Sequence, residues 1–180
     1  KKKKTRVHTN ENGELHVNVS PKDVRKFIAN GLVRYSDFGA RGDGKSDDMD
    51  AITATHAFAN QHGLKVKADD GATYYIGGKE RTAHIQTDTD FGKASFIIDD
   101  TEVQNRNASV FMVTSSLQAF KPEGISSLKR NQEKIDISLP GTCLITVTNA
   151  HVMNYIRFGL NQNSGSPQTD IFIVDSNGNV

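Results

Sequence analysis

The chain has 180 residues, a length that suits one domain of ordinary size or two small ones. Its 22 Lys and Arg residues nearly balance 21 Asp and Glu residues, and the net charge of +1 argues against a dedicated nucleic-acid-binding protein. No apolar run approaches the roughly 18 residues of a transmembrane helix, so no membrane span is expected. The single cysteine excludes an internal disulfide and a zinc site built from several cysteines.

A short helix is predicted near the start of the chain, after the basic segment 1–6 and a weakly alternating stretch at 15–19. Ser20 followed by Pro21 is typical of a helix start, because serine caps free backbone N–H groups and proline fits the first helical turn. Asn30-Gly31 is typical of a helix end. The predicted helix is short and has an apolar side.

A glycine-rich loop at 39–44 separates a predicted strand at 33–38 from a longer helix. Asp47 is the expected N-cap of this helix, which should run to about residue 61. Ile52 and Phe58 lie on its predicted buried stripe, and Gly63 is the expected stop. Because the chain must turn sharply into the helix, we expect a positive φ at one of the loop glycines at least.

Short strands separated by turn residues dominate the chain after Gly63, with one further short helix predicted at 126–131. The strands are recognised by alternating or continuous apolar blocks. They are expected at 64–68, 73–76, 96–98, 110–113, 135–139, 143–148, 152–158 and 171–174. The last of these is followed by Asn177-Gly178, a strong hairpin signal without a returning strand. We therefore expect the chain to be the front part of a longer protein.

Residues 35–52, with the sequence YSDFGARGDGKSDDMDAI, resemble the opening of the pectate-lyase-like superfamily. The resemblance continues through Gly63–Val66 and Gly71–Ile76. Members of this superfamily are right-handed parallel β-helices, and they include polygalacturonase-like hydrolases, polysaccharide lyases and phage tailspikes. The resemblance implies a mainly β fold, namely the opening coils of a right-handed parallel β-helix (solenoid) with an N-terminal amphipathic capping helix. It also divides the chain into an N-terminal extension with a short helix at 1–32 and the cap and first coils at 33–180.

The resemblance implies a carbohydrate-active protein with a polysaccharide as partner. The first hypothesis is a polysaccharide lyase or glycoside hydrolase acting on acidic polysaccharide, with catalysis mostly outside this segment. The alternative is a non-catalytic glycan-binding or adhesion protein, and a third is a purely structural cap. A secreted, cell-surface or periplasmic location follows from the same resemblance. Whether the chain is an enzyme, and its oligomeric state, stay open.

Three side chains on one face of the predicted strand at 152–158 and beside it are candidates for catalysis: His151, Tyr155 and Arg157. A lyase needs a base to remove the proton beside a uronate carboxylate and a cation to neutralise that carboxylate, and these residue types meet both needs. The polar run at 161–163 offers hydrogen bonds to sugar hydroxyls. An ordinary amphipathic surface strand is the competing interpretation.

The remaining polar clusters are interpreted as structural. Adjacent carboxylates at 47–48, 69–70 and 99–100 do not by themselves make a hydrolase site, because neighbours on a strand point to opposite faces. Solvated turn residues are the expected account. No resident cofactor is expected. Calcium is conceivable at Asp88 and Asp90 with Thr87 and Thr89, but no specific motif supports it. His56 and His62 are expected to be surface or cap residues of the longer helix.

Overall fold

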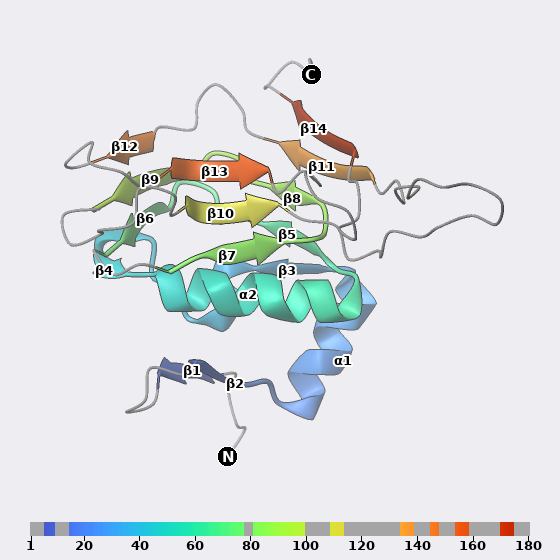
Figure 1. The fold of residues 1–180 in the computed structure, drawn as a ribbon. Helices are drawn as coiled ribbons and strands as arrows, with labels where there is room; N and C mark the ends of the chain where they lie inside the picture. Colours follow the sequence, from blue (N-terminus) through green and yellow to red (C-terminus); the bar gives the residue numbers. More distant parts are fainter. Residues whose placement is uncertain are drawn as a thin grey trace, which may run out of the picture.

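A computed structural model describes residues 6–9, 15–77, 81–99, 109–113, 134–138, 145–147, 154–158 and 170–174. Most of its strands belong to three parallel sheets (Figure 1), whose strand orders are β14-β11-β8-β5-β3, β12-β9-β6-β4 and β13-β10-β7. A separate antiparallel pair joins β1 to β2. The strands are β1 (Arg6–Thr9), β2 (Leu15–Asn18), β3 (Leu32–Arg34), β4 (Asp43–Asp47), β5 (Lys65–Lys67), β6 (Thr73–Ile76), β7 (Ala83–Ile85), β8 (Thr89–Asp90), β9 (Ser95–Ile98), β10 (Ser109–Val113), β11 (Lys134–Ser138), β12 (Ile145–Val147), β13 (Asn154–Phe158) and β14 (Asp170–Val174).

Two α-helices and one 3-10 turn accompany these strands: α1 (Pro21–Asn30), η1 (Tyr35–Phe38) and α2 (Met49–His62). In Figure 1, α2 runs alongside β7, and α1 lies farther from the three sheets. The Asn60 side chain joins α2 to the β7 segment, donating to the His84 carbonyl at 2.8 Å and accepting from Gln86 N at 3.0 Å. Neither helix of the described part is long and apolar enough to cross a membrane.

The core lies between α2 and the sheets and is rich in aromatic rings. Phe27, Phe38 and Phe58 form one group, in which ring centroids lie 5.5–5.8 Å apart. Phe91, Phe96 and Phe111 form a second group, with centroids 5.2–5.9 Å apart. The first group joins α1, η1 and α2, so the helices supply a large share of the packing.

The fold class expected from the sequence, a mainly β right-handed parallel β-helix, is wrong for this structure. The described residues form a small mixed α/β domain of short parallel sheets with two helices, and no regular solenoid is present among them. The physical reason is that the helices contribute a large share of the buried residues. α2 alone contributes eight buried residues, so it forms one wall of the core. The strands beside it have only two to five residues each.

Several local predictions are confirmed. Ser20 caps α1 by accepting from Asp23 N at 3.2 Å, and Gly31 closes it with φ of 66°. Gly42 and Gly44 both have positive φ, at 62° and 73°. Ile52 and Phe58 are buried, and the strand at 73–76 has the predicted bounds.

Other local predictions are wrong. The predicted strand at 33–38 ends at Arg34, because the Asp37 side chain accepts from Arg34 N at 2.9 Å and stabilises a 3-10 turn there. The longer helix begins at Met49, and its N-cap position is held by Asp48 and not by Asp47. Of the two alternatives for the helix histidines, a surface or a cap residue, the surface position is wrong for His56, which is fully buried, while His62 is exposed. The predicted helix at 126–131 and the hairpin signal at 177–178 lie outside the described residues.

Candidate functional site

A pocket of about 330 Å³ lies between the loop that follows η1 and the turn that precedes β6. We call it the turn pocket. Its lining is mostly polar, with one hydroxyl, one guanidinium and two carboxylates among small side chains. The lining residues are Ser36, Ala40, Arg41, Gly42, Asp69, Asp70, Gly71 and Ala72.

The loop side of the turn pocket is held by a buried carboxylate. Asp48 is only 2% exposed, and it accepts hydrogen bonds from Arg41 N at 2.8 Å and Gly42 N at 2.9 Å. Burial raises the pKa of the Asp48 carboxyl, while these two hydrogen bonds act in the opposite direction. The buried Asp48 carboxylate therefore fixes the backbone of the loop at Arg41 and Gly42.

The loop and the turn approach each other as closely as a glycine allows. Gly42 has φ of 62°, and a Cβ atom added to it would lie 2.7 Å from Ala72 Cβ. Thr73 N donates to the Gly42 carbonyl at 3.0 Å and continues the contact between β4 and β6. A larger residue at position 42 would push the two walls of the turn pocket apart.

The turn side is held by Asp69. Its carboxylate accepts from Ser36 N at 3.0 Å, from Ser36 Oγ at 2.5 Å and from the Tyr74 hydroxyl at 2.7 Å. The Tyr74 hydroxyl also accepts from Asp69 N at 2.7 Å. Burial, and then the hydrogen bond to Asp69, raise the pKa of Tyr74. Tyr74 thus keeps its proton and anchors the Asp69 carboxylate.

Two charged groups of the turn pocket remain available. Arg41 and Asp70 are exposed, and within the described ranges neither the Arg41 guanidinium nor the Asp70 carboxylate has a side-chain partner. A ligand with both a negative group and hydroxyl groups matches this pair, because guanidinium binds carboxylates in a bidentate manner and carboxylates accept from hydroxyls.

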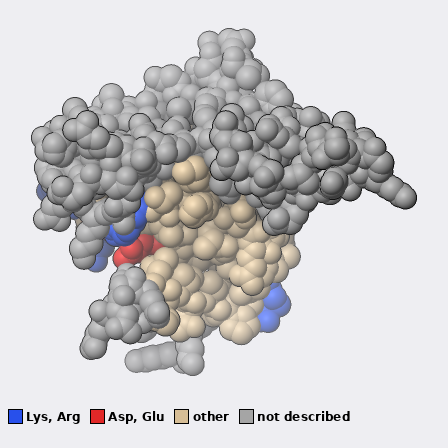
Figure 2. All heavy atoms as spheres, viewed as in Figure 1, with Lys and Arg blue, Asp and Glu red and all other residues tan. Residues whose placement is uncertain are grey.

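A second polar cluster lies beside the start of α2. Arg81 forms ion pairs with Asp47 and, at 3.0 Å, with Asp50. Nearby, the Tyr75 hydroxyl donates to Asp99 at 2.6 Å. Figure 2 shows acidic and basic atoms side by side at this end of α2, while the neighbouring described surface is mostly uncharged. Because Arg81 pairs with carboxylates of both β4 and α2, this cluster ties the residues after β6 to the start of α2.

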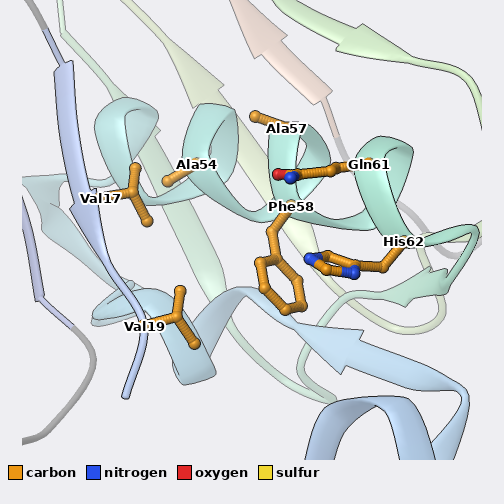
Figure 3. A pocket seen from close by; sticks show the side chains of 7 residues that line it. All are labelled: Val17, Val19, Ala54, Ala57, Phe58, Gln61 and His62. Atoms are coloured by element: carbon orange, nitrogen blue, oxygen red, sulfur yellow. The ribbon is translucent and has the colours of Figure 1, made fainter. Parts of the chain in front are cut away.

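A third hollow, of about 270 Å³, lies between α2 and the β2 segment. Figure 3 shows Val17 and Val19 on one side, and Phe58 beside His62 on the other. The two rings have centroids 4.3 Å apart. This hollow is largely apolar and has few groups that would orient a ligand.

The structure does not test the residues predicted as a catalytic site. Tyr155 and Arg157 belong to β13, where Arg157 is in register with Met112 of β10. The side chains of Tyr155 and Arg157, all of His151 and the run at 161–163 lie outside what the structure describes. A role for these residues stays a prediction.

At the conceivable calcium position, Thr89 and Asp90 have hydrogen-bond partners within the chain, whereas the buried Thr87 Oγ1 has none among the described residues. Thr89 Oγ1 donates to the Thr87 carbonyl at 3.1 Å, and Asp90 accepts from Gly92 N at 2.9 Å. Across the described residues no group of three or more His, Cys, Asp or Glu side chains is placed to hold a metal ion.

The turn pocket was not predicted from the sequence. The sequence predicts a solvated turn at 69–70, whereas in the structure Ser36 and the Tyr74 hydroxyl both donate to the Asp69 carboxylate. Comparison with protein families, with curated proteins and with solved structures finds no match to this chain.

Proposed function

We propose that the chain is part of a carbohydrate-active protein, and that the turn pocket binds an acidic sugar unit of a polysaccharide. One observation carries the proposal: the exposed Arg41 guanidinium and Asp70 carboxylate, which have no side-chain partners in the part of the chain that the structure describes, line the same pocket, whose backbone is fixed by Asp48 and Asp69. The resemblance seen in the sequence supports the same class of ligand.

The chemistry of the pocket fits a uronate. Arg41 would pair with the sugar carboxylate, and Asp70 would accept from a ring hydroxyl. Because Asp48 and Asp69 hold the walls before a ligand arrives, little ordering is required on binding. The volume of about 330 Å³ is near the small end of the range of ligand pockets, which favours one sugar unit over a long stretch of chain.

Binding is favoured over cleavage in this part of the chain. The carboxylates of Asp47 and Asp50 beside α2 are both engaged in ion pairs with Arg81. The hydrogen bond to Asp99 raises the pKa of Tyr75, which makes this tyrosine a poor base at neutral pH. Asp69 is occupied by Ser36 and Tyr74. Lyase or hydrolase chemistry would then fall to other residues, His151, Tyr155 and Arg157 among them.

The test is titration calorimetry with oligogalacturonate and with a neutral oligosaccharide of the same length. We expect the wild type to bind the acidic ligand. Arg41→Gln should raise the dissociation constant about tenfold to a hundredfold, the size of one hydrogen bond between charged groups. Lys45→Gln is the matched control, since Lys45 is an exposed cation on β4 that does not line the pocket. Absence of binding to acidic oligosaccharides, or equal losses in the two variants, would contradict the proposal.

A further inference from the structure

A histidine and a tyrosine are paired inside the core, far from bulk water. Tyr35 of η1 and His56 of α2 are both 0% exposed, and the Tyr35 hydroxyl lies 2.6 Å from His56 Nε2. The other ring nitrogen, His56 Nδ1, is buried and has no hydrogen-bond partner among the described residues. The ring of Phe111 packs against the imidazole with centroids 5.8 Å apart.

This arrangement accommodates a neutral imidazole and not a charged one. A protonated imidazole donates from both nitrogens. The Tyr35 hydroxyl can accept from Nε2, but nothing described accepts from Nδ1, so a charged ring would leave a buried donor without a partner.

Among the described residues, no carboxylate forms an ion pair or hydrogen bond with His56. The ring neighbours of His56 are Tyr35 and the apolar Phe111. The Asp69 carboxylate instead contributes to the raised pKa values of Tyr35 and Tyr74. Besides Tyr35, the titratable residues on the strands and the 3-10 turn packed against α2 are Arg6, His8, His16, Arg34, Asp37, Lys65, Lys67 and His84. His16, Lys65 and His84 are exposed, and Arg34, Asp37 and Lys67 are half-buried, the Asp37 carboxylate being turned to Arg34 N.

We propose that the Tyr35–His56 pair is an acid-sensitive latch. His56 can accept a proton only when it leaves the core, so acid favours a state in which α2 is released from η1 and the sheets. The latch acts on the fold itself and does not depend on what the turn pocket binds. Its ligand is the proton, and its moving element is α2 together with the rings that pack on it.

The direction of the pH dependence follows from the pKa of His56. Burial lowers this pKa from 6.5 to about 3 in the folded chain. As the pH falls below 6.5, the unfolded chain takes up a proton at this position and the folded chain does not. Stability is therefore full above that pH and is lost progressively between about 6.5 and 3.

The main experiment is urea unfolding of the full chain at a series of pH values from 7 to 4.5. The variant is the double substitution Tyr35→Phe with His56→Phe, which removes both polar partners and leaves rings of similar shape. Relative to this variant, we expect the unfolding equilibrium constant of the wild type to rise up to about tenfold per pH unit below 6. The exposed His84→Gln is the matched control and should keep the wild-type slope. Equal slopes in the wild type and the double variant would overturn the proposal.

A second measurement uses the wild type alone and so does not require the variant to fold. Deuterium exchange at the imidazole C2 position, read residue by residue by mass spectrometry, depends on protonation and exposure of each ring. We expect slow exchange at His56 and fast exchange at His84 near neutral pH, and loss of amide protection along α2 as the pH is lowered to 4.5. C2 exchange at His56 as fast as at His84, or an α2 whose amide protection does not change, would refute the latch.

Discussion

The two α-helices of the described region are stabilised in different ways. α1 has explicit signals at both ends, namely the Ser20 cap and Gly31, but Phe27 is its one buried residue. α2 has no side-chain hydrogen bond from its N-cap residue, yet eight of its residues are buried. α1 is therefore specified mainly by local sequence and α2 mainly by tertiary packing. Substitutions in the two helices should separate these contributions, and four are ordered below by expected effect.

The largest effect is expected for Phe58→Ala in α2. Phe58 is 7% exposed and contacts the rings of Phe27 and Phe38. Removing a buried ring costs about 3–5 kcal/mol of unfolding free energy, through lost transfer energy and the cavity left behind. Chemical denaturation measures this loss. An unchanged denaturation midpoint would contradict the packing role of α2.

Asn60→Ala should have the next largest effect. Its amide satisfies two backbone groups of the β7 segment, the His84 carbonyl and Gln86 N. Losing both hydrogen bonds should cost about 1–3 kcal/mol. Hydrogen exchange at Gln86 N provides a local reading, and we expect its protection to fall more than that of amides in β9. Uniform loss across the domain would instead indicate a general weakening of the fold.

For α1 we expect a smaller effect from its cap. Ser20→Ala removes the acceptor for Asp23 N and should cost about 1 kcal/mol. Ser20→Asp is the matched control, because aspartate also caps helices and should retain most of the stability. Circular dichroism with urea titration distinguishes the two variants, and equal stability of both would show that α1 does not need its cap.

The smallest effect is expected for Ile28→Ser, also in α1. Ile28 is 51% exposed although it adjoins the buried Phe27. Exposed substitutions usually change the unfolding free energy by no more than about 0.5 kcal/mol. A loss above about 1.5 kcal/mol would mean that this side of α1 is covered, and that the contrast between the helices is weaker than we describe.

The same contrast explains which features the sequence could predict. Local signals were sufficient for both ends of α1, for the Gly63 stop of α2 and for the glycines of the 39–44 loop, because each of these is decided within a few residues. The predicted start of α2 was wrong because the Asp48 carboxylate accepts from Arg41 N and Gly42 N. These contacts depend on the conformation of the preceding loop and not on the helix sequence.

Features that depend on distant partners were missed. β4 has no apolar pattern, since its burial alternates only between exposed and half-buried, and it exists through pairing with β6. The burial of His56 could not be predicted from the helix sequence, because it depends on the contact with Tyr35, 21 residues earlier. The fold class failed for a related reason: a motif at 35–76 was extended to the whole chain, whereas the helices proved to be a major part of the core.

The Asn60 bridge also bears on the order in which the chain assembles during synthesis. Asn60 bonds to backbone groups 24 and 26 residues later, so α2 can be completed on the ribosome long before its partners exist. The contact between His56 of α2 and Tyr35, by contrast, joins α2 to residues that have already been synthesised. We expect α2 to pack first against η1 and to gain its full protection only after β7 has emerged. Protease digestion of stalled nascent chains ending before and after β7 would reveal this sequence of events, and identical protection in both would contradict it.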